Sequence, residues 1–335
     1  MKIKGQRDVH GFIFLCGMLV LGLFSIGTVS HVQGQDAPFP SKPVEIIVPF
    51  GPGGIIDLGS RIFSESLSKE LKVPVVIRNQ AGGSGLTGST MFFTAKPDGY
   101  TLLAASGAAV ISTVQLTKTP PFDPRKDFLP LGYIADSPVA MSVPKSSPFK
   151  SFDDFLQFAK KNPRKLNGGT AGLGGENHMM FLAIVNDNKI ETRMIPYGAS
   201  GDMFVALLGG HVDWITSSLP STMPYARSGD VRILLLTRRL PALPDVPSGP
   251  DIGLPNASVN MWMGLFAHSQ TPKAVHDRLV SAVKTASQDA EMAKKLVNAG
   301  FSVMYRNPQE FSNLINEQWS IFARGLKQSG MMGDK

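Results

Sequence analysis

The sequence is poor in cysteine, in charge and in long apolar runs. Its 335 residues include one cysteine, and 18% of them are charged. A single thiol cannot form an internal disulfide, so the fold must be stabilised by burial of apolar side chains. No segment beyond the N-terminal region is apolar enough to cross a bilayer, which excludes a multi-span membrane protein. With 43% hydrophobic residues, the chain can form a large core or two ordinary ones, which excludes disorder.

The first 34 residues have the composition of a secretory signal peptide. Basic residues precede an apolar run at residues 11–28, and short residues at 32–34 precede a cut before Gln35. We therefore predict an exported protein with a signal peptide at residues 1–34. An uncleaved anchor helix is the alternative, because the run is long for a signal peptide. Bulky residues before Cys16 argue against a lipoprotein signal.

From residue 44 onward, apolar segments of strand length alternate with helical patterns. Strands are predicted at residues 44–49, 73–78 and 101–105, with helical segments between them. This order is typical of parallel strands in an open α/β sheet, which binds ligands at the carboxyl ends of its strands. A second series of strands and helices starts near residue 139 and predicts a second sheet.

Two lobes are expected because the mature chain exceeds the usual size of one domain. We place lobe 1 at residues 35–137 together with 260–335, and lobe 2 at residues 138–259. Two crossover segments, at residues 132–143 and 259–267, would then form a hinge. Each lobe is predicted to be an α/β sheet with flanking helices.

Glycine-rich turns after the lobe 1 strands are candidate anion sites. After the first strand, residues 51–54 permit a tight turn and leave amide groups free at a helix start, which favours an anion. An ordinary strand-to-helix turn is the alternative, and Asp57 also fits the role of a loop brace. The candidate ligand-binding residues of lobe 1 are Phe50, Gly53, Gly54, Ile55, Ile56, Asp57, Ser84, Gly85, Ser106 and Gly107.

Residues 83–88 match the G-x-G-x-x-G pattern of dinucleotide-binding proteins. That chemistry also needs an acidic residue for the ribose near the end of the next strand. No Asp or Glu occurs between residues 99 and 121. The pattern is therefore interpreted as a second backbone site for an anion or carbonyl group, and no nicotinamide cofactor is expected.

Similar turns follow the predicted strands of lobe 2. A glycine-rich loop at residues 168–175 leads into a helix, and small polar residues end the next two strands. Each turn is a weak signal alone, but together these turns are predicted to face one cleft. The candidate ligand-binding residues of lobe 2 are Thr170, Gly172, His178, Tyr197, Gly198, Ala199, Ser217 and Ser218.

The sequence has no recognisable catalytic or metal-binding set. Beyond the signal segment, the histidines His178, His211, His268 and His276 lack the spacing of metal ligands, and no nucleophile elbow occurs. His178 is more typical of a structural group than of a base, and Trp214 of a core residue. We expect no catalytic residue, no metal, no cofactor and no enzymatic activity.

The net charge of +7 raises the question of a nucleic-acid partner. Basic residues form only short clusters, such as those at 160–161 and 238–239, without interleaved aromatic residues, so no nucleic-acid binding is expected. A mildly positive field suits a small anion better.

The sequence resembles the substrate-binding proteins of tripartite tricarboxylate transporters, the Bug family, from about residue 40 to the C-terminal helix. The resemblance rests on several separate segments rather than on one short motif. They are Pro-Phe-Gly-Pro-Gly-Gly at 49–54 with Asp57, Lys-Pro-Asp-Gly-Tyr-Thr-Leu at 96–102, Phe-Asp-Pro at 122–124, Pro-Tyr-Gly at 196–198 and Leu-Pro-Asp-Val-Pro at 243–247.

This resemblance implies a type II periplasmic binding protein, a Venus flytrap that closes on a small carboxylate held by amides, hydroxyls and water. The expected partners are membrane permease subunits of a tripartite transporter, and the expected state is a monomer. A sensor component for a membrane receptor kinase is the alternative. An exported hydrolase is a third reading, which the lack of a nucleophile with a base disfavours.

Two positions depart from the pattern of the family. Ile56 stands where a hydroxyl residue is common, and Glu176 adds a negative charge to a loop that usually has none. Together with Ile55, and with Trp214 if it reaches the cleft, Ile56 would make the pocket more apolar. This favours a ligand with an aromatic or aliphatic body over a small hydroxy acid.

Overall fold

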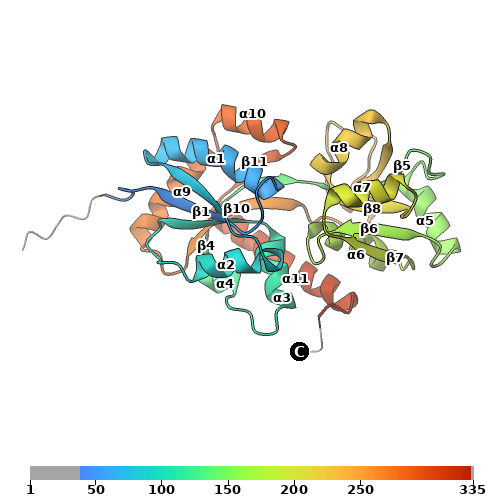
Figure 1. The fold of residues 1–335 in the computed structure, drawn as a ribbon, viewed down its shortest axis with the longest axis horizontal. Coiled ribbons are helices and arrows are strands. Elements are labelled where there is room, and N and C mark those ends of the chain that lie inside the picture. The colour runs from blue at the N-terminus through green and yellow to red at the C-terminus, as the bar shows by residue number, and fades with distance from the viewer. Residues whose placement is uncertain (1–37, 333–335) are drawn as a thin grey trace, which may run out of the picture. The chain divides into compact units, whose positions relative to one another are not determined.

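The computed structural model describes residues 38–332 (Figure 1). The predicted signal peptide at residues 1–34 lies outside the described residues. Within residues 38–332, no helix combines the length and the apolar character needed to cross a membrane.

Lobe 1 is built on a six-stranded sheet with the strand order β11-β4-β10-β3-β1-β2. Strand β1 pairs in parallel with β2 and with β3. Strand β10 pairs antiparallel with β3 and with β4, and β11 pairs antiparallel with β4. The prediction of a parallel sheet therefore holds for the first three strands only. The strands are β1 (Val44–Val48), β2 (Val75–Asn79), β3 (Thr101–Ala105), β4 (Phe128–Ser137), β10 (Met261–His268) and β11 (Ser302–Arg306).

Helices cover both faces of this sheet, which explains why β1 is almost continuously apolar. Ile46 packs in a core with α1, α9 and α10, whereas the next residue, Ile47, packs in a core with α2, α3 and α11. The helical elements of lobe 1 are α1 (Ile55–Leu71), η1 (Gly83–Gly85), α2 (Leu86–Phe93), the π-helix η2 (Ala108–Ser112), α3 (Thr113–Leu116), α4 (Pro124–Asp127), α9 (Lys273–Ala286), α10 (Ala290–Asn298) and α11 (Pro308–Gln328).

Lobe 2 is built on a five-stranded sheet with the strand order β7-β6-β8-β5-β9. Strand β6 runs parallel to β7 and β8, and β5 runs antiparallel to β8 and β9. The elements of lobe 2 are β5 (Val139–Pro144), α5 (Phe152–Lys161), β6 (Asn167–Ala171), α6 (Glu176–Asp187), β7 (Arg193–Tyr197), α7 (Ser200–Leu208), β8 (Trp214–Ser218), α8 (Leu219–Ser228), β9 (Val231–Leu236) and η3 (Pro250–Ile252).

Trp214 belongs to the core of lobe 2. Its indole stacks on the Phe181 ring at a centroid distance of 4.4 Å and contacts the edge of Phe155. The side chain is fully buried. The interpretation of Trp214 as a core residue is therefore confirmed, and the alternative that it helps to shape an apolar pocket is wrong, because consecutive residues of β8 point to opposite faces of the sheet and this one faces α5 and α6.

The chain crosses between the two sheets twice, and one polar cluster joins both crossings. It passes from β4 to β5 at Pro138 and returns from β9 to β10 through residues 237–260. At this junction the buried Asp136 carboxylate accepts hydrogen bonds from the Tyr133 hydroxyl at 2.7 Å and from Asn260 at 2.9 Å. It also forms an ion pair with Arg238 at 2.8 Å. We call these four residues the crossover cluster.

Candidate functional site

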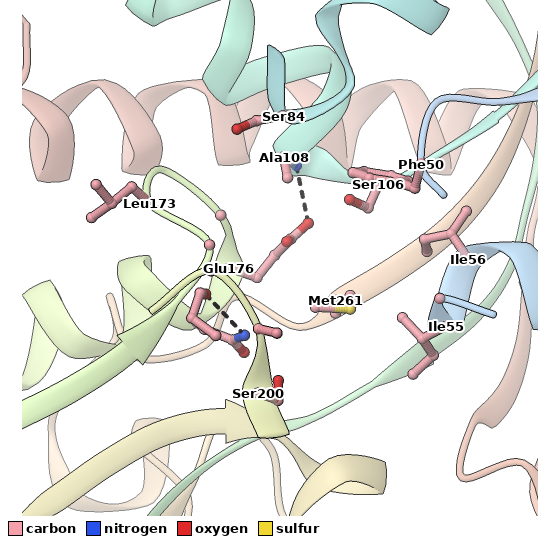
Figure 2. Close-up of a pocket in the computed structure, with 17 residues that line it drawn as sticks. Phe50, Ile55, Ile56, Ser84, Ser106, Ala108, Leu173, Glu176, Ser200 and Met261 are labelled. Carbon is pink, nitrogen blue, oxygen red and sulfur yellow. Dashed lines mark hydrogen bonds between the residues drawn. The ribbon is translucent and has the colours of Figure 1, made fainter. Parts of the chain in front are cut away.

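Residues from both lobes line a cleft of about 430 Å³ (Figure 2). This volume lies within the usual range for small-molecule sites. Lobe 1 contributes Phe50, Gly54, Ile55, Ile56, Ser84, Ser106, Ala108 and Met261, and lobe 2 contributes Ala171, Gly172, Leu173, Gly175, Glu176, Asn177, Gly198, Ala199 and Ser200.

Helix α1 of lobe 1 and helices α6 and α7 of lobe 2 begin at the cleft. Helix α1 follows its N-cap Gly54 and helix α7 follows its N-cap Ala199, and neither N-cap offers a side chain to the first-turn amides. In α1, the first backbone amide that donates to a carbonyl four residues earlier is that of Leu58, which bonds to Gly54. In α7 it is that of Met203, which bonds to Ala199. The amides before them have no helical acceptor, and the positive end of each helix favours a negative charge. The cleft therefore offers hydrogen-bond donors to an anion from two sides.

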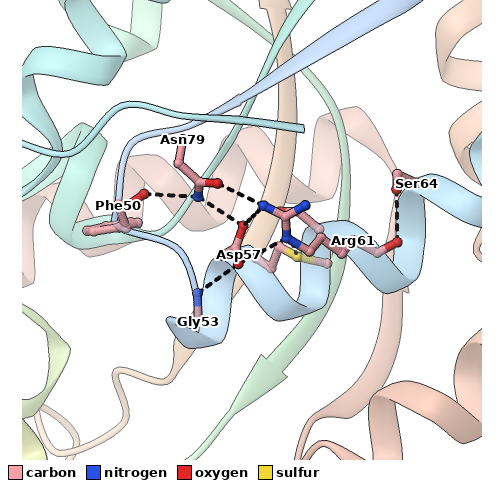
Figure 3. Close-up of polar contacts among 8 residues, drawn as sticks. Phe50, Gly53, Asp57, Arg61, Ser64 and Asn79 are labelled. Atoms are coloured by element: carbon pink, nitrogen blue, oxygen red, sulfur yellow. Dashed lines mark hydrogen bonds and ion pairs between the residues drawn. The ribbon is translucent and has the colours of Figure 1, made fainter. Parts of the chain in front are cut away.

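Asp57 holds the turn that begins α1 (Figure 3). Its carboxylate accepts the Gly53 amide at 2.9 Å and the Asn79 side-chain amide at 2.9 Å, and pairs with Arg61 at 2.9 Å. Burial raises the pKa of Asp57, but the hydrogen bonds from Arg61, Gly53 and Asn79 outweigh it and hold the pKa below its usual range. Asp57 does not line the cleft, so the structure supports its role as a loop brace and not as a ligand contact.

Glu176 is the first residue of α6, and its side chain reaches across to lobe 1 (Figure 2). Its carboxylate accepts the Ala108 amide at 3.1 Å, and the residue is 1% exposed. Burial raises the pKa of Glu176, although hydrogen bonds from its own amide, from Ala108, from Ser106 and from Gly107 oppose the shift. Among the described residues that line the cleft, Glu176 is the one ionisable side chain.

Asn177 presents an unused acceptor in the lining. Its side-chain nitrogen donates to the Ala171 carbonyl at 3.3 Å, whereas its Oδ1 has no partner among the described residues. The side chain is buried. A buried acceptor without a partner costs free energy, so a donor from a ligand or an ordered water would stabilise it.

The structure brings half of the candidate ligand-binding residues together. These residues come from five separate turns, as expected for the carboxyl ends of neighbouring strands and the helix starts that follow them. The candidates that line the cleft are Phe50, Gly54, Ile55, Ile56, Ser84, Ser106, Gly172, Gly198 and Ala199.

Four glycine or aromatic candidates lie beside the cleft without lining it. The Gly53 amide is bonded to Asp57, and Gly85 faces Ala109, whose Cβ would lie 2.6 Å from an added Cβ. Gly107 lies against Glu176. Tyr197 packs on the core of lobe 2. These residues hold the lining in place, and a direct ligand contact is not supported for them.

The remaining candidates are buried in lobe 2. Thr170 and Ser217 are fully buried, and the hydroxyls of Ser218 and Ser221 are hydrogen-bonded at 2.9 Å at the start of α8. Position at the end of a strand therefore did not bring these side chains to the cleft.

His178 is a buried structural group. Its Nδ1 accepts the Gly174 amide at 3.0 Å, which fixes the glycine-rich loop before α6. Burial lowers the pKa of His178 to about 4, so the ring is neutral at neutral pH. It does not line the cleft. The interpretation of His178 as a structural group therefore fits the geometry better than its role as a ligand contact.

We expect the free energy of unfolding to fall as the pH drops from about 6.5 to about 4. In this window unfolded His178 binds a proton and folded His178 does not, so the unfolded state binds more protons and gains stability. The contribution at pH 4.5 is about 2 to 3 kcal/mol. Urea unfolding at pH 7.5 and pH 4.5 measures it.

The matched variant is His178→Asn, whose oxygen can accept the Gly174 amide without titrating. The loss of stability between pH 7.5 and pH 4.5 should be smaller in this variant by the amount given above. Equal losses in both proteins would show that His178 does not control this part of the pH dependence.

Sequence comparison connects this geometry to a family. Residues 60–330 match the family described as the tripartite tricarboxylate transporter family receptor. A protein encoded in the tcbD-tcbE intergenic region of Pseudomonas sp. (strain P51) is 32% identical over 309 residues, which cover 90% of this chain and 91% of that protein.

Two solved structures have similar folds at moderate identity. The periplasmic binding protein BugD is 29% identical with a TM-score of 0.73, over 88% of this chain and all of that chain. MatC from Rhodopseudomonas palustris, solved with bound malate, is 29% identical with a TM-score of 0.73, over 86% of this chain and all of that one. The two-lobed fold and the resemblance to Bug proteins are confirmed, and the chain belongs to the tripartite tricarboxylate transporter receptor family.

Proposed function

We propose that this chain captures a small carboxylate in the cleft and delivers it to the permease subunits of a tripartite transporter in the periplasm. The observation that carries the proposal is the convergence of two helix starts, α1 of lobe 1 and α7 of lobe 2, on one cleft. The malate in MatC supports a carboxylate as the class of ligand. Family members are receptors that bind solutes and do not transform them.

Backbone donors suffice for useful affinity without an arginine. Each hydrogen bond to a charged acceptor contributes about 1.5 to 3 kcal/mol. Four or five such bonds would exceed the cost of association and leave a complex near −8 kcal/mol, which corresponds to micromolar affinity. The candidate contacts are the lining residues of the predicted set, with Ser200 and Asn177 added from the structure.

The proposal includes a hinge between the lobes. Lobe 1 comprises residues 35–137 and 260–335, and lobe 2 comprises residues 138–259. Closure of the lobes would bring α1 and α7 onto the same ligand and present a closed form to the permease. Export by the signal peptide at residues 1–34 and a monomeric state belong to the same proposal.

We expect carboxylates to raise the melting temperature of the purified protein, because a ligand that binds only the folded state stabilises it. At a concentration of 100 times Kd the gain in stability is about 2.7 kcal/mol. Thermal unfolding with a panel of aliphatic and aromatic carboxylates measures it. The matched controls are the primary amides of the same acids, which have the same skeleton without the charge.

The amides should leave the melting temperature unchanged. A panel in which no carboxylate shifts the transition, or in which amides shift it equally, would overturn the proposed function.

A further inference from the structure

The carboxylate of Glu176 sits in a cradle of lobe 1 backbone. Its Oε1 accepts the Ala108 amide at 3.1 Å, at the start of the π-helix η2. A Cβ added to Gly107 would lie 3.2 Å from the same oxygen, so a side chain at this position would press against the carboxylate. The absence of a side chain at residue 107 thus lets the backbone approach the Glu176 oxygen closely.

The cradle contacts the Glu176 carboxylate without a cation nearby. Glu176 is 1% exposed, and no ion pair among the described residues includes it. No Lys, Arg or His occurs among the described residues that line the cleft. Amide and hydroxyl donors on their own are also the means by which such a cleft would hold the carboxylate of a ligand.

Glu176 also bridges the two lobes in the way that a ligand would. It belongs to α6 of lobe 2, whereas Ala108 belongs to lobe 1. The donors of α1 and α7 lie elsewhere in the same cleft and remain available. The cleft thus has two anion positions, of which the chain itself fills the one at Ala108.

We propose that Glu176 is a tethered carboxylate that fills this second anion position, so that the ligand supplies one carboxylate and an apolar body. This inference rests on the proposed function. A second ligand carboxylate would find the Ala108 amide already bonded and would lie beside a like charge. The apolar side chains that line the same cleft are Phe50, Ile55, Ile56, Leu173 and Met261, which suit an alkyl or aryl group.

The test compares acids that share a skeleton and differ by one carboxylate. Calorimetry at pH 7.5 should show hexanoate binding at least about tenfold more tightly than adipate, and benzoate than terephthalate, because the second carboxylate lacks charged hydrogen bonds. In Glu176→Ala the position is vacated, so adipate should bind at least about tenfold more tightly than to the unmodified protein. Hexanoate affinity should change by less than about threefold.

Glu176→Gln is the matched control. It keeps the size of the side chain and an acceptor oxygen for the Ala108 amide, so it should gain less affinity for adipate than Glu176→Ala does. If both variants gained the same affinity for adipate, charge repulsion alone would explain the weak binding of adipate to the unmodified protein. The inference that Glu176 occupies an anion position would then be overturned.

The remaining outcomes separate this inference from the proposed function. If adipate or terephthalate binds the unmodified protein as tightly as its monocarboxylate partner, the inference is wrong and the proposed function stands. If other carboxylates bind but neither hexanoate nor benzoate does, the inference is also wrong. If no carboxylate binds at all, the proposed function fails. None of these comparisons needs a variant, so they hold even if Glu176→Ala does not fold.

Discussion

The Gly198→Phe protein should fold normally and lose carboxylate binding. Gly198 lines the cleft, its backbone is not in the left-handed region, and a Cβ added to it would meet no atom within 4 Å. The Cβ of a phenylalanine has open space there, and its ring would occupy the volume that the ligand needs. We expect affinity for the best carboxylate of the panel to fall at least about 1000-fold, equal to about 4 kcal/mol.

Gly201→Phe is the matched control. Gly201 lies in the first turn of the same helix, α7, an added Cβ would also meet no atom within 4 Å, and the residue does not line the cleft. Both variants should unfold within about 1 kcal/mol of the unmodified protein, since exposed substitutions have small effects. Binding to Gly198→Phe that equals binding to Gly201→Phe would place the ligand outside this cleft.

Much of the fold could be predicted from the sequence because each strand of the first parallel unit carries a strong pattern. The continuous apolar run of β1 and the glycine turn that ends it mark a buried strand and a helix start, and both were predicted within one or two residues. The local sequence pattern is enough to predict these elements without knowledge of their long-range packing.

The strands near the crossings could not be predicted in the same way. Strands β4 and β5 follow each other with one residue between them, and that stretch was interpreted as a crossover alone. Strand β11 pairs antiparallel at the sheet edge and has half-buried residues throughout. Their existence depends on partners that are distant in sequence, so a local pattern does not reveal them. The mixed direction of the lobe 1 sheet was missed for the same reason.

The site shows a similar division. Glycine-bearing turns at strand ends indicated which loops meet, and nine of the predicted residues do line the cleft. The sequence could not show which atoms of those loops are already used within the chain. The Gly53 amide is taken by Asp57 and the His178 nitrogen by Gly174, and only three-dimensional geometry reveals such bonds.

Glu176 illustrates what a departure from a family pattern can and cannot tell. Its negative charge stood out in the sequence, yet nothing there indicated that its carboxylate would reach the Ala108 amide of the other lobe. Ser200 and Met261 were missed as well, although a polar residue at the start of α7 was a signal that could have identified Ser200. Met261 enters from β10, a strand with no turn motif of its own.

The Arg238→Ala protein should be about 3 to 5 kcal/mol less stable than the unmodified protein. Arg238 pairs at 2.8 Å with Asp136, whose side chain is 2% exposed, so the variant leaves a buried carboxylate without its cation. The Tyr133 and Asn260 donors remain, but they carry no charge. Urea unfolding measures the loss, and a second substitution, Asp136→Asn, should restore part of it because a neutral amide needs no cation.

Its sequence neighbour provides the control. Arg239 pairs with Asp251 at 3.0 Å, but their side chains are 66% and 36% exposed, so Arg239→Ala should cost at most about 1 kcal/mol. Equal losses in the two variants would mean that burial of Asp136 has no energetic consequence. The crossover cluster joins both chain crossings, so a large loss in Arg238→Ala alone would show that the pair holds the junction about which the lobes would move. The two arginines look equivalent in the sequence, and the burial of their partners distinguishes them.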